Sequence, residues 1–204
     1  DGPSGVGKGT VANIMAHELH WNLLDSGAIY RAFALAASKR NIQIDNTDEL
    51  LKLASNLDLR FESDPSNNKL SVYLDNSEVS VELRTEETAE RASKFAMIGA
   101  LRESLLLRQQ KFKQLPGLVA DGRDMGTVVF VDAPFKVFLT ANVEERARRR
   151  LKQLQDKGIT GILSQTLEEV QKRDQRDVSR KNSPLRPSKD ALVIDTSNLT
   201  INEV

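Results

Sequence analysis

The spacing of apolar residues divides the chain into segments with helical periodicity and short apolar runs. The first helical pattern follows residue 10 and places Val11, Ile14, Met15 and Leu19 on one face. Further patterns with a period of three to four residues predict helices at 28–40, from Asn46 or Thr47 onward, 85–98, 100–114, 143–157 and 166–181. Short apolar runs bounded by turn residues predict strands at 21–24, 118–120, 136–140 and 191–195.

Residues 57–84 depart from this alternation. They contain three short strand-like runs separated by turn-rich segments, at 57–62, 70–74 and 78–81, which predict a small antiparallel sheet. Elsewhere strands alternate with helices, which is typical of a parallel sheet covered by helices on both faces. We therefore predict one α/β domain over 1–204, with three layers (α/β/α) and an inserted subdomain at 57–98.

The first residues match the phosphate-binding pattern G-x-x-x-x-G-K, from Gly2 to Lys8. Glycines allow successive backbone N–H groups to surround phosphate oxygens, and a helix that follows directs its positive end at the same oxygens. Gly9 occupies the position where a hydroxyl residue is usual, so Thr10 is the expected magnesium ligand. The predicted ATP-binding residues are Gly2, Pro3, Ser4, Gly5, Val6, Gly7, Lys8, Gly9 and Thr10.

Both ends of the sequence suggest elements that extend beyond it. A phosphate loop normally follows a central strand, and no strand pattern precedes Asp1. At the other end, Thr200 and Glu203 have the spacing of a capping box, which marks the start of a helix. We expect the first core strand and the last helix to be absent from this sequence.

Composition excludes several classes of protein. The 204 residues include 29 basic and 29 acidic side chains, a balance that argues against a nucleic-acid or membrane-surface partner. There is no cysteine, which excludes disulfides, thiol catalysis and cysteine-bound metals, and there are only two histidines. No apolar run approaches the length of a membrane span and no signal peptide is visible, so a cytoplasmic location is predicted.

Charge is unevenly distributed along the chain. Residues 41–100 carry 12 acidic and 6 basic side chains, whereas residues 140–190 carry 13 basic and 8 acidic ones. The basic segment could face an anionic ligand, but composition alone favours solvated helix faces.

Two further motifs are more specific than the phosphate loop: LDSGAIYR at 24–31 and DGRDMGT at 121–127. Together with the G-K-G-T loop they resemble the bacterial cytidylate kinases, which are P-loop nucleoside monophosphate kinases. The resemblance covers essentially the whole chain. It implies transfer of a phosphoryl group from ATP, bound with Mg²⁺, to CMP and also dCMP. It also implies a monomer whose partners are these small molecules.

The resemblance assigns roles to individual residues. Lys8, Arg123 and Arg173 are the implied catalytic residues. Ser93, Arg102 and Asp124 would read the cytosine base. The full implied CMP site comprises Ser26, Arg31, Ser93, Arg102, Arg123, Asp124, Arg173, Asp177 and Arg180.

Several of these assignments leave alternatives open. Asp121 follows a predicted strand, where it could order magnesium through water or simply cap the next turn. Arg173, Asp177 and Arg180 share a helix face by spacing, which an exposed ion-paired face would also show. A lid is predicted at about 155–166. One or more of the three arginines that precede it would screen the charge of the transferred phosphoryl group: Arg146, Arg149 and Arg150.

Two other functions are compatible with the phosphate loop itself. One is a kinase for another small acceptor, such as a different nucleoside monophosphate or a sugar acid. The other is a regulatory protein that binds ATP or GTP and turns over slowly without an acceptor. The many arginines outside the loop favour a phosphorylated acceptor.

Overall fold

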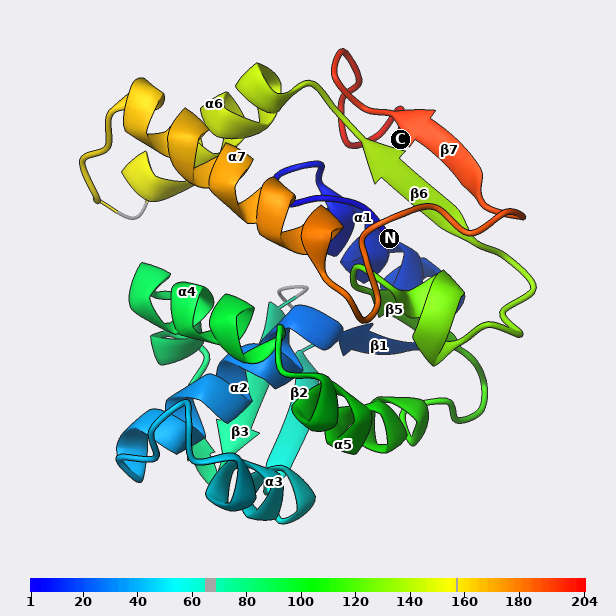
Figure 1. Cartoon of the computed structure of the whole chain (residues 1–204). Coiled ribbons are helices and arrows are strands. Elements are labelled where there is room, and N and C mark those ends of the chain that lie inside the picture. Colours follow the sequence, from blue (N-terminus) through cyan, green and yellow to red (C-terminus); the bar gives the residue numbers. More distant parts are fainter. Residues whose placement is uncertain (65–68, 157) are drawn as a thin grey trace. The chain divides into compact units, whose positions relative to one another are not determined.

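The structure is a computed structural model that describes residues 1–64, 69–156 and 158–204 (Figure 1). It divides into two compact units. The P-loop unit consists of Asp1–Ala12 and Asp121–Val204, and the helical unit consists of Asn13–Ala120. Helix α1, Lys8–Leu19, begins in the first unit and ends in the second.

The helical unit is built around α2, Ser26–Lys39. Ile29, Phe33, Ala36 and Ala37 are fully buried, as their spacing predicts. Phe33 packs edge-to-face against Phe95 with ring centroids 5.3 Å apart, which is a favoured aromatic geometry. The surrounding helices are α3, Thr47–Ser55; α4, Glu86–Phe95; and α5, Gly99–Gln110.

This unit also contains the predicted antiparallel sheet, with strand order β2-β3-β4. The strands are β2, Leu59–Asp64; β3, Lys69–Leu74; and β4, Ser77–Glu78. Leu59 pairs with Leu74, and Phe61 pairs with Val72. A second, two-stranded sheet pairs β1, Asn22–Asp25, with β5, Leu118–Asp121.

The prediction of a strand over 78–81 was wrong in extent, because β4 ends at Glu78. The hydroxyl of Ser80 accepts a hydrogen bond from the Val72 amide at 2.9 Å and so occupies a donor on β3. Val81 then takes helical backbone angles and caps the short 3₁₀ turn η1, Glu82–Arg84. A side chain that bonds to the backbone has therefore replaced ladder pairing at this edge.

The P-loop unit contains a parallel strand pair, β6 and β7, whose bounds are Val137–Thr140 and Leu192–Asp195. Helices α6, Val143–Gln155, and α7, Leu163–Ser179, run side by side (Figure 1). A π-helical turn, η2, covers Met125–Val129.

Two helix predictions need correction. In α1, Met15 and Leu19 are nearly half exposed, whereas Ala12 and Ala16 are buried. The packed face of this helix is therefore the alanine face, where small side chains permit close approach. Helix α7 begins at Leu163 instead of 166, within the predicted lid, and the Thr166 amide bonds to the Ile162 carbonyl at 3.0 Å.

At the end of the chain, the predicted capping box is present. The Thr200 amide donates to the Glu203 carboxylate at 2.8 Å, and the Glu203 amide donates to the Thr200 hydroxyl at 3.3 Å. Only a turn follows within the chain.

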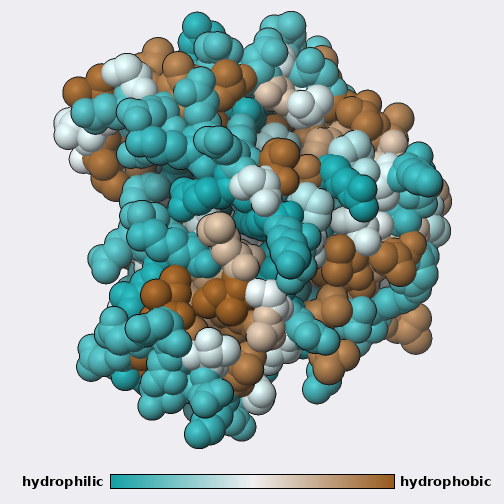
Figure 2. Space-filling model, viewed as in Figure 1, coloured by the Kyte–Doolittle hydropathy of each residue, from teal (hydrophilic) through white to brown (hydrophobic). Residues whose placement is uncertain are grey.

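No helix in the described part of the chain is long and apolar enough to cross a membrane. On the face drawn in Figure 2, hydrophobic residues form separate patches among hydrophilic ones. Mixed surfaces of this kind are ordinary for folded proteins.

Candidate active site

The phosphate loop has a backbone that requires glycine. Gly2, Gly5 and Gly7 have φ values of 144°, 83° and 93°, which side chains with a Cβ rarely adopt. Space is limiting as well, since an ideal Cβ on Gly2 would lie 2.1 Å from the Leu139 carbonyl oxygen. The loop leads directly into α1 at Lys8. Its geometry is that of an anion cradle at a helix N-terminus.

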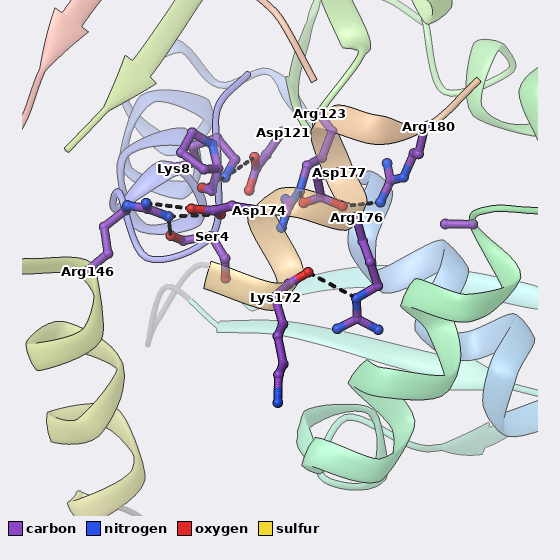
Figure 3. Close-up of polar contacts among 12 residues, drawn as sticks. Ser4, Lys8, Asp121, Arg123, Arg146, Lys172, Asp174, Arg176, Asp177 and Arg180 are labelled. Carbon is purple, nitrogen blue, oxygen red and sulfur yellow. Dashed lines mark hydrogen bonds and ion pairs between the residues drawn. The ribbon is translucent and has the colours of Figure 1, made fainter. Parts of the chain in front are cut away.

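Lys8 lies across this loop (Figure 3). Its ammonium donates to the Pro3 carbonyl at 2.8 Å and lies 3.9 Å from an Asp121 carboxylate oxygen. Both side chains are largely buried, with 10% and 14% of their surface exposed. These contacts hold the Lys8 ammonium beside the loop.

The loop is anchored at its start and in its middle. The Asp1 carboxylate accepts hydrogen bonds from the amides of Met125 and Gly126, at 2.9 and 2.8 Å. These bonds connect the loop to the DGRDMGT motif. Val6 packs in the core beside Leu139 and Ala141.

A buried ion cluster surrounds Asp177 of α7 (Figure 3). The Arg123 Nε contacts one Asp177 carboxylate oxygen at 2.5 Å, and the Arg180 guanidinium donates to the other. Only 1% of the Asp177 side chain is exposed. Burial alone would raise the pKa of Asp177, but the attraction of Arg123 and Arg180 outweighs it and holds the pKa below its usual value.

This shift predicts a loss of stability in acid. A carboxyl whose pKa is lower in the folded state stabilises the fold above its unfolded pKa of about 3.9, and the contribution disappears as the pH falls toward the folded value. We expect Asp177→Asn to flatten the pH dependence of the free energy of unfolding below about pH 4. Urea titrations across that range measure it. Glu169→Gln, at an exposed position of α7, is the matched control, and equal slopes for all three proteins would contradict the assignment.

The three arginines expected near the lid do not have equal roles. Arg146 is buried and donates to both oxygens of Asp174, at 3.0 and 2.6 Å, and to the Ser4 carbonyl at 3.2 Å (Figure 3). Arg149 donates to the Thr196 carbonyl at 2.6 Å. Arg150 has a long contact, 3.4 Å, with Gln153. Arg146 therefore connects the phosphate loop to α7.

In the helical unit, Ser26 and Arg31 lie on α2, as predicted. Asp25 caps this helix by accepting from the Ala28 amide at 2.9 Å, and its other oxygen accepts from Arg31 at 2.9 Å. The buried Ser26 hydroxyl donates to Gln109 at 2.6 Å. The carboxylate thus holds Arg31 at the start of the helix.

The two predicted base-reading residues of this unit are both buried. The Ser93 hydroxyl on α4 makes no hydrogen bond among the described residues. Arg102 on α5 donates to the Ala96 carbonyl at 3.1 Å, and its guanidinium carbon lies 5.5 Å from the Tyr30 ring centroid. A buried hydroxyl without a partner is unusual in proteins and is a candidate ligand contact.

Sequence reasoning missed the residues that hold these groups in place: Asp25, Gln109 and Asp174. Asp25 could have been found, because an aspartate before a helical pattern is a strong N-cap. Gln109 and Asp174 carry no such signal, since their partners lie 83 and 28 residues away along the chain.

No group of three or more His, Asp or Glu side chains in the described residues is placed to hold a metal ion. Thr10 is exposed in the first turn of α1, and Asp121 lies beside Lys8. One hydroxyl and one carboxylate suit a cation that is held mainly by phosphate oxygens and water.

Comparison with known proteins identifies the family. A family model described as cytidylate kinase matches residues 1–204. The chain belongs to the cytidylate kinase family. The cytidylate kinase of Shewanella sediminis (strain HAW-EB3) is 50% identical over 204 residues, which cover 100% of this chain and 89% of that protein. Those of Shigella sonnei (strain Ss046) and Escherichia coli O1:K1 / APEC are 53% identical with the same coverage.

Membership of the cytidylate kinase family confirms three predictions from the sequence: the resemblance, the α/β fold and the enzyme class. Cytidylate kinases are transferases that phosphorylate CMP and dCMP. The two alternative functions, another acceptor kinase and a slow regulatory nucleotide-binding protein, are thereby set aside.

Proposed function

We propose that the chain transfers the γ-phosphoryl group of ATP to CMP, or to dCMP, with the side chains described above in defined roles. The observation that carries this proposal is the P-loop unit itself. One compact unit holds a phosphate cradle with Lys8 and a buried arginine cluster on Asp177. The cradle suits the donor, and Arg123 and Arg180 suit the acceptor phosphate.

The reaction needs no general base. The attacking group is a phosphate oxygen, which is already ionised at neutral pH. His17 lies near the far end of α1, roughly 14 Å along the helix from Lys8, and His20 follows the end of this helix. Rate enhancement would come from positioning and from charge neutralisation by Lys8, Arg123 and Arg173.

Magnesium would enter with ATP. Thr10 would contribute a hydroxyl and Asp121 a carboxylate acting through water. When bound, the ion would neutralise charge on the donor phosphates. Lys8 would exchange its Asp121 contact for the β- and γ-phosphates.

The proposed acceptor-binding residues are those that the resemblance to cytidylate kinases assigns to CMP. Ser26, Arg31 and Arg123 would hold the CMP phosphate, and Arg173, Asp177 and Arg180 would hold the sugar and phosphate. Ser93, Arg102 and the buried Asp124 would read the cytosine edge, where CMP differs from UMP at an amino group and at ring N3. A site lined with such groups rejects a base that leaves them unpaired.

Ser93→Ala provides a test that separates binding from folding. The Ser93 hydroxyl makes no hydrogen bond among the described residues, so its removal should leave the melting temperature unchanged. Loss of one hydrogen bond to CMP should lower kcat/KM for CMP by roughly 2- to 10-fold. Steady-state kinetics and thermal melts measure the two effects.

The matched control is Ser80→Ala. The Ser80 hydroxyl is also buried, but it bonds to the Val72 amide. This variant should lose stability and keep its relative preference for CMP over UMP. A Ser93→Ala protein that melts at a lower temperature and keeps its kcat/KM for CMP would contradict a base-reading role.

The proposed reaction is tested by ADP release with CMP, dCMP, UMP, AMP and GMP as acceptors. Rapid ADP formation with CMP and dCMP, and little with the purine nucleotides, is the expected result. An enzyme that uses AMP or GMP as well as CMP would overturn the assignment of the base-reading residues. The acceptor-binding insert at 57–98, the lid, the monomeric state and the cytoplasmic location stay predictions.

A further inference from the structure

The helical unit contains a cavity of about 950 Å³. Its walls come from the second half of α1, the start of β1, the end of α3, strand β2, and one face of α5 with the residues that follow. None of the residues assigned above to ATP or CMP lines it. Its size lies in the range of cavities that bind small molecules.

The charged side chains on the cavity wall are all basic. Arg108 lies on α5 and Lys111 at its C-terminal end. The rings of His17, on α1, and His20, just after α1, also line the cavity. The described lining residues include no aspartate or glutamate. Two acidic side chains lie near this group: Glu18, largely exposed and 3.9 Å from the His17 ring nitrogen, and Asp58, which interacts with Arg108.

Arg108 is poorly satisfied by the protein. Its Nε is buried without a hydrogen-bond partner among the described residues, and one Nη donates to the Leu59 carbonyl at a long 3.4 Å. Burial lowers the pKa of Arg108, and the nearby Asp58 offsets this only in part. The buried Nε is out of reach of a ligand, so an anion in the cavity would be bound by the Nη groups of Arg108.

Three aromatic rings give another part of the cavity wall a flat and apolar surface. Phe61 and Phe112 pack edge-to-face with centroids 5.3 Å apart. Trp21 lies against Gly117, where an ideal Cβ would come within 2.4 Å of the indole ring. Glycine at 117 therefore lets the indole lie directly on the backbone and form part of the wall.

We propose that this cavity binds a small organic anion that carries a flat aromatic ring. Arg108 and Lys111 contact the anionic group, and Trp21, Phe61 and Phe112 contact the ring. Two classes of metabolite have this chemistry: nucleoside triphosphates and aryl carboxylates. The site would be separate from the substrate sites and would accept either class by the same contacts.

Trp21 is the only tryptophan of the chain, so its fluorescence reports on this cavity. The probe is anilinonaphthalene sulfonate (ANS), an aromatic anion, with ADP and CMP present to fill the substrate sites. We expect saturable ANS binding with energy transfer from Trp21. Arg108→Gln should weaken binding by about 10-fold or more, since hydrogen bonds to charged groups are strong. Lys111→Gln, at an exposed position, should weaken it by roughly 2- to 5-fold.

Lys113→Gln is the control, because it removes the same charge from an exposed position outside the cavity lining. It should bind ANS like the parent protein. Thermal melts exclude unfolding as the cause of any change, and Lys111→Gln tests the proposal if Arg108→Gln does not fold. Unsaturable binding, or equal affinity in the Arg108, Lys111 and Lys113 variants, would overturn the proposal.

Displacement of ANS then distinguishes the two ligand sources. GTP and phenylpyruvate are the two competitors, and toluene is the neutral comparison. Displacement by GTP identifies a nucleotide site, and displacement by phenylpyruvate identifies an aryl carboxylate site. Displacement by toluene alone, or by none of the three, would show that apolar contact holds the probe and would overturn the proposal.

Discussion

Replacing Lys8 by alanine should lower kcat by at least ~100-fold, because loss of one preorganised charge at a transition state typically costs about 3 kcal/mol. In the structure, the Lys8 ammonium contacts the Pro3 carbonyl and Asp121 at the mouth of the phosphate cradle. Steady-state ADP formation with CMP as acceptor measures the effect.

The control for this prediction is Lys39→Ala, which removes a half-exposed lysine with one ion pair to Glu82 at 3.5 Å. Its kcat should stay within a factor of two of the parent value, because the pair of Lys39 with Glu82 involves no residue of the phosphate loop. An exposed ion pair also contributes only ~1 kcal/mol or less to the free energy of unfolding. Folding of the Lys8 variant is checked by thermal melting. A folded Lys8→Ala protein with nearly normal kcat would contradict the role of the loop in phosphoryl transfer.

Among the substitutions proposed for this chain, Arg146→Ala should cause the largest decrease in the free energy of unfolding. The substitution leaves Asp174 without its bidentate partner and frees the carbonyls of Ser4 and Ala141. Breaking a buried ion pair from one side costs about 3 to 5 kcal/mol. For a chain of this size, 3 kcal/mol corresponds to a fall in melting temperature of roughly 6 to 12 °C.

Arg148→Ala is the matched control on the same helix, because Arg148 is 66% exposed and its contact with Glu145 is 3.7 Å long. It should melt within about 2 °C of the parent protein. Steady-state kinetics of the Arg146 variant, measured below its melting temperature, provide a second test. Since Arg146 bonds to the Ser4 carbonyl, its loss should raise KM for ATP more than KM for CMP. Equal melting temperatures for the two variants would show that the Arg146–Asp174 pair contributes no stability.

Local patterns along the chain were sufficient for most helices and strands. Helix α2 occupies 26–39, close to the predicted 28–40, because four apolar residues at helical spacing all enter one core. The phosphate loop was equally clear, since positive φ angles at Gly2, Gly5 and Gly7 require glycine whatever surrounds them. Asn46, one of the two residues predicted to start α3, caps this helix through its hydrogen bond with the Glu49 amide.

Predictions from periodicity failed where contacts with other elements decide the outcome. The apolar face of α1 is partly exposed because the packed side is the one that carries Ala12 and Ala16. Strand β4 stops early because a hydroxyl, that of Ser80, takes a backbone donor from β3. Neither effect is visible in the local pattern, because each depends on a neighbour from another element.

The sequence by itself determined the family, the phosphate loop and the set of arginines that we predict to bind phosphates. These depend on residue types in short motifs, and motifs are local. Tertiary structure alone decided how the arginines are used. Arg123 and Arg180 share Asp177, whereas Arg146 pairs with Asp174 and fastens the phosphate loop. All are arginines in a basic stretch or motif. Only the carboxylates and carbonyls that folding brings beside them distinguish the pair on Asp177 from Arg146.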